Sequence, residues 1–279
     1  MGELGNGTFA SSTLPVLISG LPELERIAVD AAHSCALVKE SGAALCWGYN
    51  GRGSLGNGDT LNSNVPVPVA GDLRFRSIGL GVFFTCGITT AEDLYCWGDQ
   101  DPDHQFAADT GSSLTPRLVQ TDLKFREVTA GEFHACALAE GGAAYCWGGN
   151  QEGDLDSGDM QSGLTPVAVS GGLTFSSLGA GAEHTCGIST VGRTYCWGYD
   201  NRGQLGQPWN PTCGADFPSC VVPLEVPGLA SMSVISAGRS HTCGVTTSGQ
   251  AYCWGANGLG EFGDGTTDDS AFPVPVSSP

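Results

Sequence analysis

The stretch HTCGISTVGRTYCWGYDNRGQLG, residues 184–206, decides the fold of this chain. Two short runs rich in β-branched and aromatic residues flank a Val-Gly-Arg turn, which is the pattern of a β-hairpin. Counted outward from Val191, Cys186 and Cys196 take opposite positions on the two strands, and side chains directly across an antiparallel pair are close enough for a disulfide. Trp197 follows the second cysteine and therefore points to the other face of the sheet, because side chains alternate along a strand.

The same pattern recurs along the chain at a nearly fixed interval. The first cysteines of five such units are separated by 51, 50, 50 and 57 residues, and each second cysteine opens a Cys-Trp-Gly triplet. A constant period of this size indicates a repeat architecture in which each repeat is one supersecondary unit. The predicted cysteine pairs are Cys35–Cys46, Cys86–Cys96, Cys136–Cys146, Cys186–Cys196 and Cys243–Cys253.

The repeats resemble those of the RCC1 (regulator of chromosome condensation) family. The residues that carry the resemblance are Ala180–Ile188, AGAEHTCGI, and Asn50–Gly58, NGRGSLGNG. The resemblance extends over almost the whole chain, and the cysteine-paired variety looks like the repeats of secreted bacterial members. It implies an all-β, RCC1-like β-propeller of about five four-stranded blades, each with a cross-strand disulfide. It implies no particular function, because RCC1-like propellers serve unrelated ones.

We expect a single propeller domain over residues 1–279. A blade should contain an inner strand, the two cysteine strands and a Pro-rich strand, which must lie at the outer edge because proline cannot donate to a ladder. Residues 2–20 match the second half of a repeat, so a Pro-rich strand at Leu14–Ile18 is left over, either closing the ring or marking truncation from a longer protein. The repeats lie near 21–71, 72–120, 121–170, 171–227 and 228–279.

Two places break the repeat. In blade two, the glycine-rich turn is replaced by the degenerate loop Asp99–Phe106. Between blades four and five lies an insertion, residues 207–220, with its own candidate disulfide Cys213–Cys220. Insertions in a repeat array map to loops on one face, often a binding face.

The twelve cysteines predict the compartment of the protein. Reduced thiols and zinc ligation are the alternatives to disulfides, but zinc ligands favour spacings of about two to four residues, whereas the pairs within the repeats have nine or ten residues between them. Disulfides place the protein in an extracytoplasmic compartment, periplasmic, cell-surface or secreted. Met1 is followed at once by repeat sequence without a signal-peptide pattern, so we expect that a leader was removed or that the chain begins inside a longer protein.

The charge of the chain argues against nucleic acid as a partner. The formal net charge is −18 with only 11 basic residues, and binding to phosphate backbones depends on clustered Lys and Arg. Such a surface suits a soluble protein or one that meets a basic partner. No segment approaches about eighteen uninterrupted apolar residues, so we expect no membrane span.

Four histidines, one per blade except in blade two, invite a metal hypothesis. We favour a hydrogen bond from each histidine to a neighbouring backbone carbonyl, because one histidine per blade is too widely spread to share an ion. Phe84 takes the same position in blade two. The four histidines are His33, His134, His184 and His241.

A calcium loop is suggested by Asp99, Asp101 and Asp103, which have the Asp-x-Asp-x-Asp opening of such a loop. The glycine and closing glutamate of an EF-hand are missing and Pro102 stiffens the turn, so a solvated acidic loop is favoured. Matches to the dinucleotide-binding fingerprint, such as Gly51–Gly56, are products of the repeat, since no helix follows them. We therefore expect no cofactor and no catalytic residue.

Trp209 and Phe217 are the candidate binding residues. The five Cys-Trp-Gly tryptophans keep step with the repeat and are therefore predicted to pack in the core or between blades, whereas Trp209 lies on the insertion. A tryptophan on an irregular loop is either a lid over exposed core or a binding anchor. The lid is slightly favoured, and a protein contact by Trp209 and Phe217 is the functional hypothesis.

The sequence therefore predicts a non-catalytic extracytoplasmic propeller with a protein-binding or structural role, such as an accessory subunit of a larger envelope assembly. One alternative is a secreted enzyme inhibitor of the β-lactamase-inhibitor type, to which the stapled propeller bears a family resemblance. Another is a glycosidase or lyase that uses paired carboxylates, although no pair stands out among 29 acidic residues. Guanine-nucleotide exchange is a cytosolic or nuclear task and is poorly suited to a disulfide-stapled acidic protein.

Overall fold

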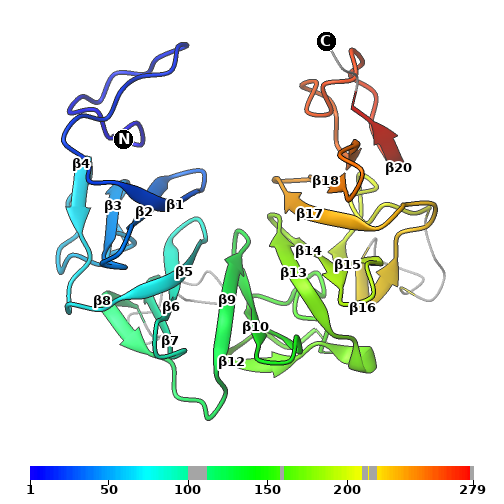
Figure 1. The fold of residues 1–279 in the computed structure, drawn as a ribbon, viewed down its shortest axis with the longest axis horizontal. Coiled ribbons are helices and arrows are strands. Elements are labelled where there is room, and N and C mark those ends of the chain that lie inside the picture. The colour runs from blue at the N-terminus through cyan, green and yellow to red at the C-terminus, as the bar shows by residue number, and fades with distance from the viewer. Residues whose placement is uncertain (100–111, 158–159, 209–212, 214–218, 277–279) are drawn as a thin grey trace. The chain divides into compact units, whose positions relative to one another are not determined.

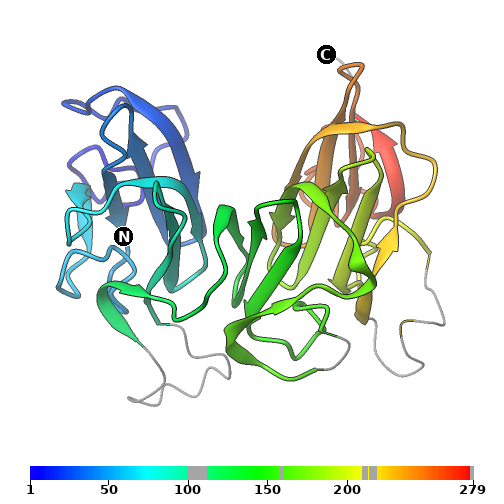
Figure 2. The same cartoon turned by 60° about the horizontal axis from the view of Figure 1, so that its bottom comes forward.

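The computed structural model describes residues 1–99, 112–157, 160–208, 213 and 219–276. Its strands form five antiparallel four-stranded sheets, the blades (Figures 1 and 2). Blades one and two contain β1 (Leu24–Val29), β2 (His33–Val38), β3 (Ala44–Gly48), β4 (Ser63–Pro68), β5 (Phe75–Leu80), β6 (Phe84–Thr89), β7 (Leu94–Gly98) and β8 (Ser113–Leu118). The prediction of an all-β fold with five four-stranded blades is confirmed.

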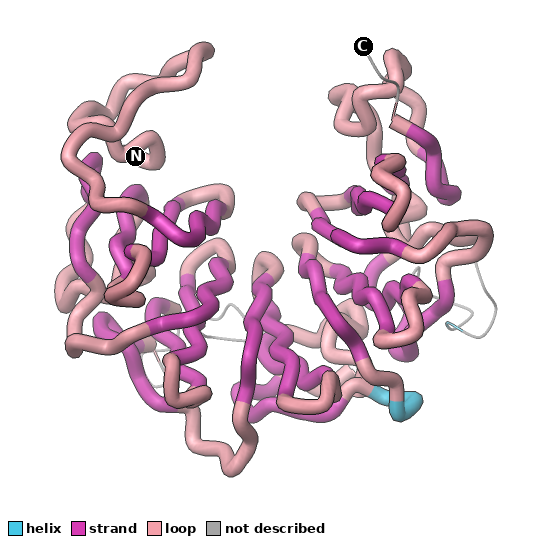
Figure 3. Tube along the Cα trace, in the orientation of Figure 1, coloured by secondary structure: helices cyan, strands magenta, loops and turns pink. Residues whose placement is uncertain are grey.

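The remaining blades repeat the same order of strands, with the Pro-rich strand always at the outer edge. A short 3-10 helix, η1 (Ser170–Gly172), follows blade three (Figure 3). Blade three contains β9 (Phe125–Ala130), β10 (His134–Ala139), β11 (Ala144–Gly148) and β12 (Gly163–Ala168). Blades four and five contain β13 (Phe175–Ala180), β14 (His184–Ser189), β15 (Thr194–Tyr199), β16 (Ser219–Glu225), β17 (Met232–Ala237), β18 (His241–Thr246), β19 (Ala251–Gly255) and β20 (Ser270–Pro275).

The chain forms two compact units, Met1–Ala130 and Gly131–Pro279, and the boundary falls directly after β9. The first unit contains blades one and two with β9, and the second contains β10, β11 and β12 with blades four and five. The single domain over residues 1–279, with the repeat limits given above, stays a prediction.

The cysteine strands pair in the predicted register. Cys186 lies opposite Cys196 between β14 and β15, and the same holds in the other four blades. All five cross-strand pairs form disulfides, which confirms the register counted from the turn. Cys213 and Cys220 form a sixth disulfide, in the insertion.

The fourth strand expected at Leu14–Ile18 does not form. A Pro-rich outer strand needs the third strand of its blade as a hydrogen-bond partner. The side chains of Leu14 and Leu17 are 74% and 84% exposed, so no sheet of the described structure covers them. This expectation from the sequence is therefore wrong.

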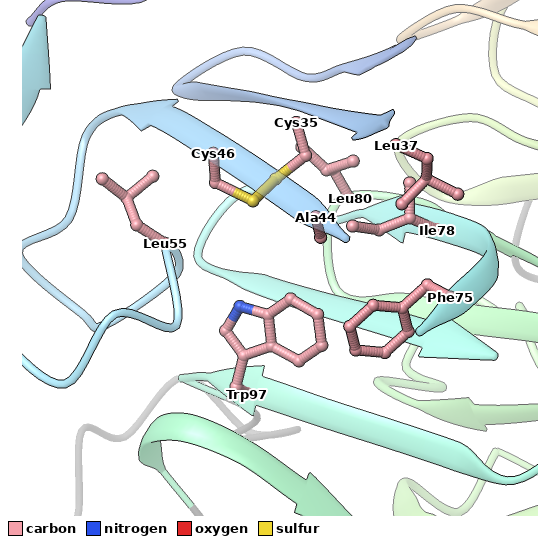
Figure 4. Packing of buried hydrophobic residues seen from close by; sticks show 9 residues of the cluster. All are labelled: Cys35, Leu37, Ala44, Cys46, Leu55, Phe75, Ile78, Leu80 and Trp97. Carbon is pink, nitrogen blue, oxygen red and sulfur yellow. A yellow bond between two sulfur atoms is a disulfide. The ribbon is translucent and has the colours of Figure 1, made fainter. Parts of the chain in front are cut away.

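Within each unit, neighbouring blades pack face to face, and their buried side chains form shared apolar clusters. Every residue of β6, β10 and β14 is buried. Between blades one and two, the disulfide Cys35–Cys46 packs with Leu55 on one side against Trp97 and Phe75 on the other (Figure 4). The rings of Phe75 and Trp97 have centroids 5.7 Å apart. The cross-strand disulfides of blades one, three and four thus belong to apolar clusters as well as linking two strands.

The glycine of Cys-Trp-Gly is required by the close approach of two strands. Gly198 has φ 95° and lies where the register between β15 and β16 shifts. A Cβ atom at this position would come within 2.7 Å of the Glu183 carbonyl oxygen. Only glycine adopts this φ without strain and leaves that space open. The third residue of Cys-Trp-Gly is therefore glycine for a steric reason.

Candidate binding site

In blades one, three, four and five, the turn that follows the Cys-Trp-Gly strand is built around one side-chain oxygen. In blade four, Asp200 Oδ1 accepts the backbone N–H of Leu205 at 3.0 Å, and Asn50, Asn150 and Asn257 do the same in their turns. In blades one, three and four, the residue before the leucine of this turn offers its backbone carbonyl as a hydrogen-bond acceptor to a tryptophan further along the chain. Trp97, Trp197 and Trp254 donate their indole N–H to the carbonyls of Ser54, Asp154 and Gln204, respectively. These tryptophans are buried, which confirms their predicted packing role. Their indole hydrogen bonds also hold the turns in place.

Three of the four histidines connect neighbouring blades. Their Nε2 atoms lie 2.8–2.9 Å from a threonine hydroxyl of the next blade, in the pairs His33–Thr85, His134–Thr185 and His184–Thr242. The expectation of a backbone carbonyl partner is therefore wrong. The sequence did not show it because the threonine lies 51 to 58 residues further along the chain, beyond any local pattern.

These histidines are neutral and structural. Burial lowers the pKa of His33 and of His184 to about 3 and that of His134 to about 4. Because Thr242 donates its hydroxyl to the Gln204 carbonyl, it accepts from His184, so Nε2 carries the proton. Among the described residues, no three His, Cys, Asp or Glu side chains are gathered so as to hold a metal ion.

The degenerate loop of blade two falls mostly outside the described residues. Of the three calcium candidates, Asp101 and Asp103 lie outside them and Asp99 lies within. The Asp99 carboxylate pairs with Arg52 at 3.1 Å and accepts a hydrogen bond from the Ser112 hydroxyl. The expectation of a solvated acidic loop, with calcium as the weaker alternative, stays a prediction.

The insertion joins β15 to β16 and thus lies within blade four, not between blades four and five as expected from the sequence. Trp209 and Phe217 lie outside the described residues. The disulfide Cys213–Cys220 and Pro208 line a cavity of about 110 Å³ together with Asp200, Leu205 and Leu224. Burial raises the pKa of Asp200 to about 6. The polypeptide leaves the insertion at Ser219, whose hydroxyl donates to Glu152 Oε2 at 2.8 Å.

Beside this point lies a group of carboxylates that the sequence analysis missed. We call Glu132, Glu152, Asp154 and Glu183 the acidic cluster. Burial, and then the negative charges of Glu183 and Glu152, raise the pKa of Asp154 well above its ordinary value. Burial, Glu152 and Glu132 likewise raise the pKa of Glu183, which Arg239 offsets only in part. Aspartate is common in turns, so Asp154 gave no signal in the sequence.

A second carboxylate in the same turn sits where the other described turns have glycine. Asp156 has φ 50°, whereas the equivalent Gly56 and Gly206 have φ 66° and 75°. Its Oδ1 accepts from the Ser170 hydroxyl at 2.9 Å, but Oδ2 is buried without a hydrogen-bond partner. Burial raises the pKa of Asp156 to about 7.

Replacing Asp156 with asparagine is expected to stabilise the protein at pH 8 but not at pH 4. The folded pKa of Asp156 lies above its unfolded value of about 4, so the protonated side chain contributes stability that is full below pH 4 and is lost as pH rises to about 7. Asparagine also tolerates a positive φ and carries no charge at any pH. Asp156→Asn should therefore raise the free energy of unfolding at pH 8 by roughly 1–3 kcal/mol.

Urea denaturation at pH 4 and pH 8 measures this difference. The exposed Asp268 provides the matched control, because Asp268→Asn removes the same charge without changing a buried group. An equal gain at both pH values, or the same gain in Asp268→Asn, would contradict the assignment to the buried carboxyl.

Comparison with known proteins gives a consistent picture of the fold. A family model described as the RCC1-like domain matches residues 1–279. The ultraviolet-B receptor UVR8 of Arabidopsis thaliana is 33% identical over 98 residues, which is 34% of this chain and 22% of that protein. The matched stretch thus spans about a fifth of that relative's length.

Two solved structures are similar over the entire chain. Human WBSCR16 superposes with a TM-score of 0.81 at 20% identity, with 76% of its chain covered. Prp20p of Saccharomyces cerevisiae, described with its binding to Gsp1p and histones, superposes with a TM-score of 0.64 at 19% identity, with 84% covered. At this level of identity, the likeness concerns the fold.

Proposed function

Because the chain belongs to the RCC1-like domain family, we propose that it acts as a non-catalytic, extracytoplasmic propeller that binds another protein. Protein binding is the class supported by Prp20p, a protein of the same fold that binds Gsp1p and histones. The six disulfides support an oxidising compartment. In the described part of the chain, no helix is long and apolar enough to cross a membrane. An accessory role in a larger envelope assembly fits these features.

The partner is proposed to dock on the insertion, residues 207–220. The observation that carries this proposal is the way the insertion is held: the disulfide Cys213–Cys220 closes it, and Ser219 ties its end to Glu152 of the preceding turn. A loop held in this manner has less entropy to lose on binding. Trp209 and Phe217 then supply the aromatic anchors that binding sites favour.

Trp209→Ala is expected to weaken partner binding by about 2 kcal/mol, or roughly 30-fold, because a buried aromatic anchor is lost. The melting temperature should stay nearly unchanged. The measurement is capture of partners from the native extracytoplasmic fraction by the immobilised wild type and variant, followed by titration of the captured protein.

Phe272→Ala is the matched control, since Phe272 is an aromatic residue of β20 that is 52% exposed and lies outside the insertion. It should bind as the wild type does. A fall in melting temperature with binding intact would show that Trp209 covers the core instead. Inhibition of an enzyme by the wild type, lost in Trp209→Ala, would identify the partner as that enzyme and support the inhibitor alternative.

A further inference from the structure

The carboxyl group of Asp154 is held in place by its own backbone. The Trp197 indole donates to the Asp154 carbonyl oxygen at 3.0 Å, so this residue is fixed where blade three meets blade four. Its Oδ1 lies 3.1 Å from the position that a Cβ of Gly198 would take. The side chain therefore lies against the Cys-Trp-Gly strand of blade four and is only 6% exposed.

Equivalent residues of the other turns satisfy their side chains locally, whereas Asp154 does not. Ser54 donates its hydroxyl to the Tyr49 carbonyl, and Gln204 Oε1 accepts the backbone N–H of Arg202. Asp154 Oδ1 is buried and has no hydrogen-bond partner. A buried carboxylate is costly unless a proton or a cation compensates it.

Nearby negative charges increase the cost of the buried Asp154 carboxylate, and hence its need for a compensating proton or cation. Glu152 and Glu183 act on it electrostatically, and Glu132 acts on Glu183. Arg239 lies 3.8 Å from Glu132, but its side chain is 83% exposed, whereas that of Glu132 is 21% exposed. A solvated arginine in this position compensates the cluster weakly. Asp154, with its buried unpartnered oxygen, is thus close enough to Glu152 and Glu183 to feel their charges, and Glu183 in turn feels that of Glu132.

We propose that the acidic cluster binds a guanidinium or ammonium group, the Arg or Lys side chain of the bound protein, with Asp154 as its deepest acceptor. A guanidinium matches carboxylates with several donors in a fixed geometry, and the stem of such a side chain reaches a recessed carboxylate. This inference rests on the proposed function. Glu152 also accepts a hydrogen bond from Ser219 at the end of the insertion. A protein bound to the insertion would therefore lie next to the acidic cluster.

A metal ion fits the described residues less well than a basic side chain. None of the His, Cys, Asp and Glu side chains in the described ranges form a group of three or more placed to hold a metal. A Ca²⁺ ion takes about six to eight oxygen ligands at roughly 2.3–2.6 Å, whereas a guanidinium needs only separate hydrogen-bond acceptors.

The test uses N-acetyl-arginine amide as the probe and N-acetyl-citrulline amide as its uncharged counterpart, each titrated into the whole protein and followed by amide NMR shifts. We expect the arginine probe to give saturable shifts around Glu132, Glu152 to Asp154 and Glu183. The citrulline probe should give none. Glu183→Gln should weaken binding of the arginine probe about tenfold, the loss of one charge-assisted contact.

Glu140→Gln is the control, because Glu140 is exposed on the same unit outside the cluster, and it should leave binding unchanged. Equal shifts with citrulline, no saturable shift, or equal loss in Glu140→Gln would each overturn the proposal. Calcium chloride that produces the same shifts more readily than the arginine probe would overturn it too, in favour of a metal site.

Partner capture separates this inference from the proposed docking. Glu183→Gln should reduce capture of the partner, and Glu140→Gln should not. If the arginine probe binds but Glu183→Gln captures the partner normally, the use of the cluster by that partner is wrong. If capture depends on Glu183 but not on Trp209, the proposal that the partner docks on the insertion is wrong, whereas the proposal for the acidic cluster is supported.

Discussion

Replacing Trp197 with alanine is expected to lower the free energy of unfolding by about 4 kcal/mol. The Trp197 side chain is fully buried. It packs between the Cys136–Cys146 disulfide of blade three and Phe175 of its own blade, with ring centroids 5.7 Å apart. Truncation removes this contact between blades and also leaves the Asp154 carbonyl without its indole donor.

Trp197→Phe separates the two contributions. Phenylalanine keeps most of the apolar contact and loses the N–H, so this variant should lose about 1–3 kcal/mol, the cost of leaving a buried acceptor unpaired. Urea denaturation followed by circular dichroism measures both variants. An unchanged unfolding midpoint in Trp197→Ala would contradict the packing of blades three and four described above.

Reduction of the disulfides is expected to unfold the protein under conditions in which the oxidised form is stable. Each cross-strand disulfide closes a loop with a sequence separation of 10 or 11 residues, which the chain-entropy model values at roughly 2.5–3 kcal/mol. Together the five disulfides contribute an amount similar to or larger than the total stability of a typical domain, which is about 5–15 kcal/mol. The double variant Cys186→Ala/Cys196→Ala should lose about 2–3 kcal/mol by itself.

Thermal unfolding with and without a reducing agent measures the first effect, and peptide mass mapping without reduction verifies the pairs. The wild type in the same reductant at a concentration too low to break the bonds is the control. Free thiols at Cys186 and Cys196 in the native protein, or a melting temperature that full reduction does not change, would contradict both the pairing and the inferred compartment.

The sequence predicted the blades well because their main contacts are local. A hairpin brings Cys186 and Cys196 together within one turn, so counting residues was enough to find the pair. Proline placed the outer strands for an equally local reason, its missing N–H. The strand expected at Leu14–Ile18 failed because strand formation also needs a partner edge, which a residue pattern does not supply.

Contacts between blades were harder to predict. His184 contacts Thr242, which is 58 residues away in the sequence. Neither residue type predicts that the other will be its partner. The acidic cluster escaped notice because its carboxylates come from three different turns, and only the burial of Asp154 distinguishes it from the other acids of an acidic chain. Asp156 carried a usable signal, a carboxylate in a position where the other described turns have glycine. Trp209 and Phe217 lie outside the described residues and stay predictions.

The hydrogen bonds from the indoles of Trp97, Trp197 and Trp254 to a preceding turn suggest a direction of assembly. In these three bonds the acceptor carbonyl precedes its donor, by 43 residues for Trp97 and Trp197 and by 50 for Trp254. During synthesis, each turn is therefore complete before the tryptophan that will anchor on it has been added. Within each unit, this order of donor and acceptor is compatible with vectorial folding, in which the earlier blade forms first as the nascent chain emerges.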